Sequence, residues 1–112
     1  AGKLLTQLKP SDRAQRVGLL ATLRFALQAK PDAGTRHAVE QSVENTYDLG
    51  VLRAASGEWR DALELFLSVL RRDRGFGGDA GRKAMLDVFD AVGQANPLAD
   101  EFRRKLSMEL FK

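Results

Sequence analysis

The strongest constraint on the fold is a run of apolar residues between Trp59 and Leu70 that recur every three or four positions. The run comprises Trp59, Ala62, Leu63, Phe66, Val69 and Leu70. This spacing places them on one face of an α-helix and predicts a helix over residues 58–73. Ser56 and Gly57 precede it as a helix stop, because glycine readily takes the left-handed conformation that ends many helices.

Weaker patterns of the same kind predict helices over most of the remaining chain. Residues 11–29, 79–92 and 97–111 each suit one helix, and residues 32–55 suit either one long helix or two. No segment shows the sustained period-two alternation that is typical of strands. We therefore predict an all-α domain over residues 1–112, built from about five or six antiparallel helices that stack as hairpins.

Capping residues and buried faces can also be assigned. Ser11 or Asp12, Asp79 and Asn96 are expected to cap helix N-termini, and Pro97 suits a first turn. In the first helix, Phe25 is expected to lie apart from the buried face. That face is expected to comprise Val17, Leu20, Leu23 and Leu27, widened by Leu19 and Ala26.

The composition narrows the functional classes. The chain has no cysteine, so it carries no disulfide, thiol nucleophile or thiolate zinc site. Its net charge of +3, from 18 basic and 15 acidic residues, does not favour nucleic-acid binding. No apolar run approaches the roughly 18 residues that suggest a membrane span. The missing disulfides fit a cytoplasmic protein, and the start at Ala1 without Met predicts a domain cut from a longer chain.

Catalytic and cofactor motifs are not apparent in the sequence. His37 is the single histidine and has no nucleophile or ligand suggested beside it. The glycine-rich residues 75–81 lack the preceding strand and the Gly-Lys-Ser/Thr of a phosphate-binding loop. Carboxylate pairs such as Asp87 and Asp90 fall on solvent faces. We therefore expect no enzyme, no metal and no cofactor.

A 34-residue frame that starts at Val43 resembles the tetratricopeptide repeat. Its signature positions are Leu49, Gly50, Gly57, Ala62, Phe66 and Val69. The small Gly50 and Ala62 would let two helices approach closely, with Phe66 filling the gap toward the next hairpin. Thr46, Arg53 and Arg74 depart from the usual residues. We predict a clear repeat over about 43–76 and a degenerate one over about 79–111.

A set of motifs between residues 45 and 111 carries a more specific resemblance. These motifs are NTYDL (45–49), RRDRGF (71–76), RKAMLDVF (82–89), NPL (96–98), FRRKL (102–106) and LF (110–111). Together they resemble the C-terminal tetratricopeptide domain of the thioredoxin-like chaperedoxins, whose members are co-chaperonins. The resemblance implies the family's non-catalytic half, which would hold unfolded clients and dock on a chaperonin through residues 97–111. The thioredoxin fold that precedes the repeats in that family has no counterpart in this sequence.

The last helix offers the first candidate binding surface. Met108 and Phe111 fall with Arg104 on the side opposite its buried face, which is expected to comprise Leu98, Ala99, Phe102, Leu106 and Leu110. This arrangement would suit a partner groove that takes amphipathic helices. The alternative interpretation is a frayed terminus with two ordinary surface hydrophobic residues.

Two further candidates lie nearer the middle of the chain. The first is a basic cluster of Arg71, Arg72, Arg74, Arg82 and Lys83. Dipole compensation with ion pairs between helices is the favoured interpretation; a clamp for acidic peptide groups and a weak nucleic-acid site are alternatives. The second is Trp59, which could line a peptide groove or join the core, whereas Phe66 is expected in the core. A generic scaffold for another cytosolic protein stays open as a function, as does the oligomeric state.

Overall fold

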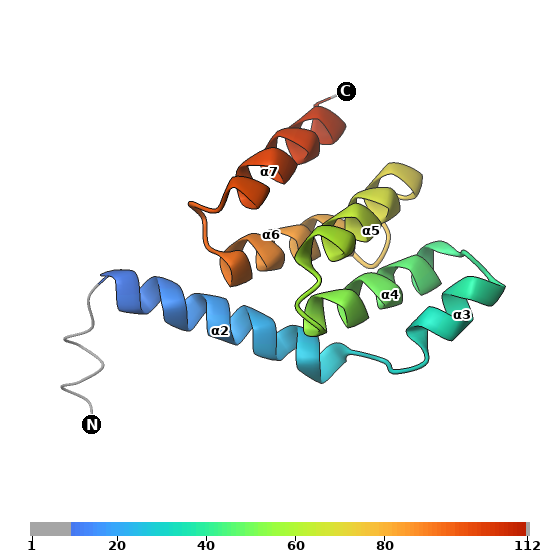
Figure 1. Cartoon of the computed structure of the whole chain (residues 1–112). Coiled ribbons are helices and arrows are strands. Elements are labelled where there is room, and N and C mark those ends of the chain that lie inside the picture. The colour runs from blue at the N-terminus through green and yellow to red at the C-terminus, as the bar shows by residue number, and fades with distance from the viewer. Residues whose placement is uncertain (1–9, 112) are drawn as a thin grey trace.

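In the computed structural model, which describes residues 10–111, the chain forms six helices joined by short turns (Figure 1). They are α2 (Pro10–Gln28), α3 (Ala33–Val39), α4 (Val43–Ala55), α5 (Trp59–Arg72), α6 (Ala80–Val92) and α7 (Pro97–Leu110). The predicted all-α class is confirmed. The region 32–55 contains two helices, because residues 40–42 leave the helical conformation between α3 and α4.

Local signals account for most helix ends. The Oγ of Ser42 accepts a hydrogen bond from the Asn45 amide at 3.1 Å, and Asn96 accepts one from the Leu98 amide at 2.9 Å. Each side chain thereby satisfies an amide that has no partner within its own helix. Gly57 closes α4 with φ of +79°, as expected for a left-handed glycine.

Two capping predictions differ from the structure. Asp79 lies at the N-cap of α6 with φ of +72°, but its carboxylate makes no capping hydrogen bond. It accepts a hydrogen bond from the Arg82 guanidinium instead, because the left-handed backbone does not aim the carboxylate at the helix amides. α2 begins at Pro10, so Ser11 and Asp12 lie inside its first turn; their side chains lie outside the described residues.

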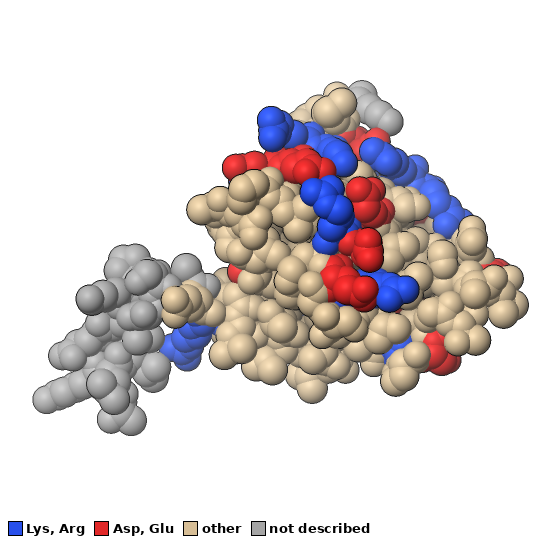
Figure 2. Space-filling model, viewed as in Figure 1, with Lys and Arg blue, Asp and Glu red and all other residues tan. Residues whose placement is uncertain are grey.

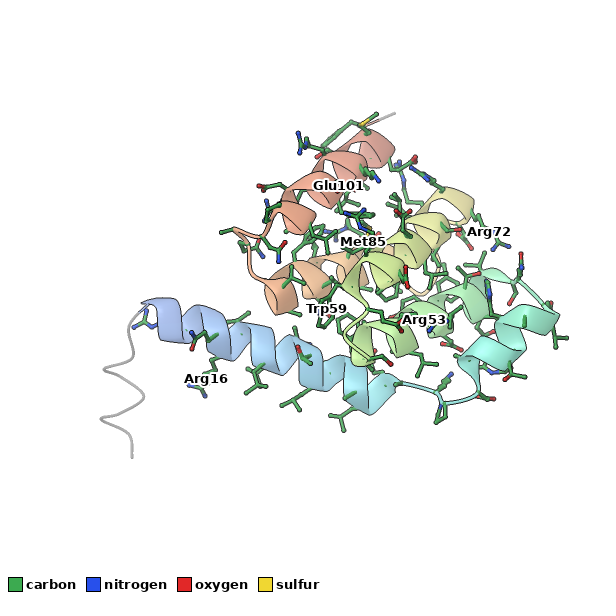
Figure 3. The ribbon with its side chains drawn as sticks, in the orientation of Figure 1. Arg16, Arg53, Trp59, Arg72, Met85 and Glu101 are labelled. Carbon is green, nitrogen blue, oxygen red and sulfur yellow. The ribbon has the colours of Figure 1, made fainter. Side chains whose placement is uncertain are left out.

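The α4–α5 hairpin forms the centre of the core. The Phe66 ring lies directly on Gly50, where an added Cβ would stand only 2.6 Å from the ring. Met85 of α6 lies in the same interior (Figure 3). The largest fully buried side chains are Phe66, Phe89, Phe102, Leu63, Leu67, Met85, Val69 and Val88. The apolar spacing of α5 therefore predicted its buried face correctly.

α2 buries the opposite face from the one expected. Gly18, Ala21 and Phe25 face the body, and Phe25 stacks on Phe66 with ring centroids 6.0 Å apart. A Cβ on Gly18 would lie 2.8 Å from the carbonyl oxygen of Asp90, so the backbones of α2 and α6 meet closely there. The expected face is exposed, at 44% for Val17, 47% for Leu20, 48% for Leu23 and 86% for Leu27.

α2 also connects two helices of the repeat region that barely touch each other. It packs against both α4 and α6. The Arg24 guanidinium lies 2.9 Å from the Asp87 carboxylate of α6, and the Lys30 ammonium lies 3.4 Å from Asp48 of α4. In Figure 1, α2 passes along one side of the α4–α6 body and α7 lies on the other side.

Candidate protein-interaction surface

The two sides of α7 differ sharply in the exposure of their apolar residues. Ala99, Phe102 and Leu106 are buried, whereas Met108 is 71% exposed and Phe111 is 84% exposed. Leu98 and Leu110 were expected to be buried but are only half-buried, because they lie at the edges of the buried stripe near the two ends of the helix. Arg104 is exposed, and its Nε donates to the Asp100 carbonyl at 3.4 Å.

Ion pairs from α5 hold α7 in place at both ends. At its start, two nitrogens of Arg60 donate to the two carboxylate oxygens of Glu101, at 2.9 and 3.0 Å (Figure 3). At its end, Arg71 Nε lies 3.1 Å from Glu109 Oε1, and the Arg74 guanidinium donates to the Glu109 carbonyl. Met108 and Phe111 therefore project from an anchored helix.

The Arg60–Glu101 contact also changes the acidity of both groups. The hydrogen bond from Arg60, followed by one from Lys105, lowers the pKa of Glu101 from 4.5 to about 2. The same hydrogen bond raises the pKa of Arg60. Both residues are thus charged at neutral pH, and the start of α7 stays held to α5.

Most arginines of the basic cluster bind groups of this same chain. Arg71 and Arg74 bind Glu109, and Arg82 binds Asp79. The Arg71–Glu109 contact is an ion pair between neighbouring helices, as expected, whereas Arg82 binds the N-cap residue of its own helix and Arg74 binds a backbone carbonyl. Arg72 differs, since it donates a 3.3 Å hydrogen bond to Thr46 Oγ1 and forms no ion pair with a carboxylate that the structure describes. Figure 2 shows acidic side chains interspersed with basic ones over the middle of the visible face, along α5 and α7.

Trp59 lies at the start of α5, half-buried against the core. Its ring centroid stands 6.4 Å from that of Phe25, with the planes tilted by 57°. It therefore contacts α2 and shares the interior with Phe66. A role for Trp59 in a peptide groove stays a prediction.

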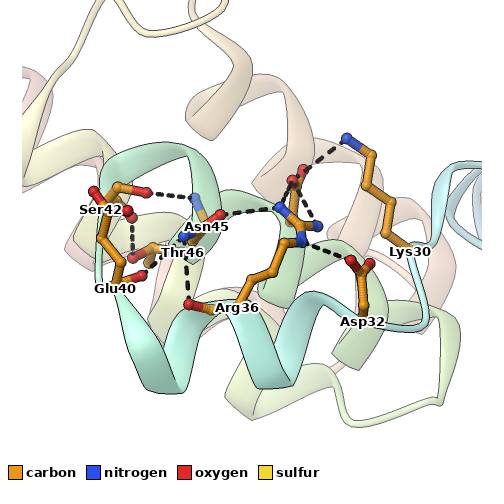
Figure 4. A network of polar contacts seen from close by, with 8 residues as sticks. Lys30, Asp32, Arg36, Glu40, Ser42, Asn45 and Thr46 are labelled. Atoms are coloured by element: carbon orange, nitrogen blue, oxygen red, sulfur yellow. Dashed lines mark hydrogen bonds and ion pairs between the residues drawn. The ribbon is translucent and has the colours of Figure 1, made fainter.

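A polar network between α3 and α4 was missed at the sequence level (Figure 4). The Asp48 carboxylate, whose side chain is only 10% exposed, accepts from Arg36 at 3.2 Å and from Lys30 at 3.4 Å. Asn45 accepts from Arg36 at 3.0 Å and donates to the Glu40 carbonyl at 2.9 Å. The Asp32–Arg36 ion pair could have been predicted from the sequence, because the two residues are four positions apart. The inward position of Asp48 required the packing of α3 on α4.

The described part of the chain shows no cluster of metal-ligating side chains. No three His, Asp or Glu side chains between residues 10 and 111 come together as metal ligands would. In the same range, no helix combines the length and the apolar character needed to cross a membrane. His37 lies half-buried on the short α3.

Comparison with known proteins now identifies the family. A family model described as tetratricopeptide repeat matches residues 13–111, which is nearly the whole chain. The chain therefore belongs to the tetratricopeptide repeat family, whose stacked helical hairpins are protein-interaction scaffolds.

The chain also matches part of a longer relative. An uncharacterized protein of Haemophilus influenzae is 28% identical over 117 residues, covering 99% of this chain and 54% of the relative. The chain thus spans about half the length of that relative. No solved structure matches the chain. Since the relative's name states no activity, the resemblance to chaperedoxins stays a prediction.

Proposed function

We propose that this domain is the non-catalytic interaction half of a cytoplasmic co-chaperonin, which docks on a chaperonin through α7 and holds unfolded clients. The observation that carries the proposal is the pair of exposed side chains on an anchored helix: Met108 at 71% and Phe111 at 84% exposure. Large apolar side chains of this kind are the usual anchors of an amphipathic helix in a partner's groove. Arg104, exposed on the same helix, would contribute a charge at the rim.

The remaining candidate residues fit a supporting role in this proposal. Arg71, Arg74 and Arg82 would set the position of α7 and of the α5–α6 turn, because their partners are Glu109 and Asp79. Arg72 would be available to an acidic group of a client. Trp59 would contribute to client binding only through the part of its ring that stays exposed.

The test measures binding of the whole 112-residue chain to a purified bacterial chaperonin by surface plasmon resonance. Met108→Ala/Phe111→Ala should weaken binding by about tenfold or more, because the exposed anchors are lost while the buried face of α7 is kept. Val39→Ala is the matched control, since Val39 is 85% exposed but lies on α3. No binding at micromolar concentration, or equal binding by the double variant, would contradict the proposal.

The second candidate function is a scaffold for a different protein of the cytosol, and the family match over residues 13–111 favours it. Affinity capture with the chain and with Met108→Ala/Phe111→Ala side by side would separate the two functions. A partner other than the chaperonin that is lost with these two side chains would support the scaffold and keep α7 as the binding surface.

A further inference from the structure

A second surface, on the opposite side of the molecule from α7, is formed by the outward side of α2. We define the α2 apolar face as Val17, Leu19, Leu20, Leu23 and Leu27. Leu19 is 60% exposed, and the other four range from 44% to 86%. On a helical wheel Leu20, Leu23 and Leu27 fall within about 60° of one another. Figure 2 shows that the charged side chains gather over the upper helices, whereas the visible surface along α2 carries few.

The α2 apolar face is larger than the scattered exposed apolar residues of an ordinary protein surface. Single exposed apolar residues are common, but a contiguous group of large aliphatic side chains marks an interaction site. The inward side of α2 is already fully used by Gly18, Ala21 and Phe25. The outward leucines therefore take little part in the packing of the helices between residues 10 and 111.

The charges that α2 itself contributes beside its apolar face are nearly all positive, whereas Asp90 of α6 lines the groove beside Leu19. From Arg13 to the end of α2 every charged residue is an arginine; Asp12, the one acidic residue of the helix, lies in its first turn. Arg24 is paired with Asp87, whereas Arg13 and Arg16 make no ion pair with a side chain that the structure describes, which leaves out the side chains of residues 11, 12 and 14. Figure 3 shows Arg16 pointing away from the body of the molecule.

This distribution disfavours a second copy of the chain as the occupant. Antiparallel packing of two α2 helices would bring together two sides whose charged residues from Arg13 to Gln28 are all arginines. Parallel packing would bring Arg16 beside Arg16. Like charges that face each other across an interface oppose association.

A shallow groove beside Leu19 adds a receiving site for a side chain. It has a volume of about 340 Å³ and lies between α2 and the end of α6. Its lining includes Gln15, Leu19 and Thr22 on one side and Val92 and Gly93 on the other. An apolar side chain from a helix laid along α2 could enter this groove, as ridges enter grooves between packed helices.

We propose that the α2 apolar face binds an amphipathic helix of a partner protein, with large aliphatic side chains on its apolar stripe and acidic residues beside Arg13 and Arg16. Burial of the leucines supplies the affinity, and the exposed Arg13 and Arg16 select the charge and the direction of the partner helix. The surface is independent of Met108 and Phe111.

The test uses dye-labelled peptides of about 18 residues, long enough to cover α2. One peptide carries a leucine stripe flanked by Glu, and a matched peptide carries Lys in place of Glu. Fluorescence anisotropy with the whole chain should show binding of the acidic peptide below about 100 μM and binding at least about tenfold weaker for the basic one. Equal binding of the two peptides, or no binding of the acidic one, would overturn the proposal.

Variants then locate the site. Leu23→Gln/Leu27→Gln should reduce binding of the acidic peptide by about tenfold or more, because two central anchors become polar. Arg16→Glu should weaken the acidic peptide and strengthen the basic one, a reversal that misfolding could not produce. Val39→Gln and Met108→Ala/Phe111→Ala serve as controls and should leave binding unchanged. Circular dichroism checks that each variant stays helical.

Sedimentation velocity tests whether a second copy of the chain, instead of a partner helix, covers the α2 apolar face. A chain that is monomeric at about 50 μM, with a Kd above this value, agrees with an external partner helix. A dimer that Leu23→Gln/Leu27→Gln dissociates would show that a second copy covers the face, and the proposal would then be wrong.

Discussion

At the scale of single residues, Gly50 and Phe66 set the distance between α4 and α5. The ring occupies the space where a side chain on residue 50 would stand, at 2.6 Å from the position of a Cβ. Phe66 is fully buried and also stacks on Phe25, so it has little room to move aside. The repeat signature thus has a direct steric meaning at this position.

We expect Gly50→Ala to lower the free energy of unfolding by about 1–3 kcal/mol, the usual cost of overpacking a core. Urea unfolding followed by circular dichroism measures the change. Gly34→Ala is the matched control, because the nearest atom to its Cβ would be Leu49 Cδ1 at 3.8 Å, an ordinary contact. Alanine should be neutral or stabilising there, since it favours helix over glycine. Equal effects at the two positions would contradict this account.

The lowered pKa of Glu101 predicts how the stability of the domain depends on pH. Its folded-state pKa of about 2 lies below the ordinary 4.5, so between these two pH values the unfolded chain binds more protons. The stabilisation by Arg60 is therefore complete above about pH 4.5 and is lost as the pH falls toward 2. Glu101→Gln should lower the melting temperature slightly at pH 7 and leave it unchanged near pH 2.

Thermal melts at pH 7, 4 and 2 compare Glu101→Gln with the unaltered chain. Glu40→Gln is the control, because Glu40 is exposed and makes no recorded ion pair among residues 10–111. A difference between Glu101→Gln and the unaltered chain that persists at pH 2 would show that the effect does not come from the Glu101 charge.

At the scale of elements, α2 shows how small residues decide which side of a helix is buried. Its leucines form the more hydrophobic stripe, yet Gly18 and Ala21 allow the backbone to approach α6 more closely than leucines would. Phe25 then reaches Phe66 and Trp59 and fills the space between α2 and α5. Close contact with many atoms at this site outweighs the larger apolar area of the other stripe.

The orientation of α2 predicts that two alanine substitutions change the free energy of unfolding by different amounts. Phe25→Ala should lower the free energy of unfolding by about 3–5 kcal/mol, because Phe25 is 2% exposed and its loss leaves a cavity. Leu27→Ala should change it by less than about 0.5 kcal/mol, since Leu27 is 86% exposed. Urea unfolding measures both. The reverse order would mean that α2 buries its leucine stripe, as the hydrophobic pattern alone suggested.

At the scale of the whole molecule, the two proposed surfaces lie on opposite sides of the repeat core. α7 is held to α5 by Arg60 and Arg71. α2 is held to α6 by Arg24, and Lys30, just after α2, binds Asp48 of α4. The connections run through separate ion pairs and separate faces of the core. One domain could therefore hold two partners at once, which suits a scaffold built from stacked hairpins.

The sequence predicted the candidate surface on α7 better than the one on α2. Met108 and Phe111 fall opposite a single apolar stripe, so the helical wheel was enough to expect their exposure. On α2 apolar residues cover most of the circumference, and periodicity cannot choose between two such sides. The buried Asp48 was missed for a related reason: its partners Arg36 and Lys30 come from other segments.

The amino-acid sequence by itself determined the helices and most of their ends. These features depend on neighbours within a few residues: the i, i+3, i+4 spacing of α5, the cap at Asn96 and the left-handed turn at Gly57. Only the tertiary structure decided which side of α2 is buried and which charges are paired. Those outcomes depend on distances between segments far apart in the chain, such as Gly18 to Asp90 and Arg71 to Glu109. Local periodicity carries no information about those distances.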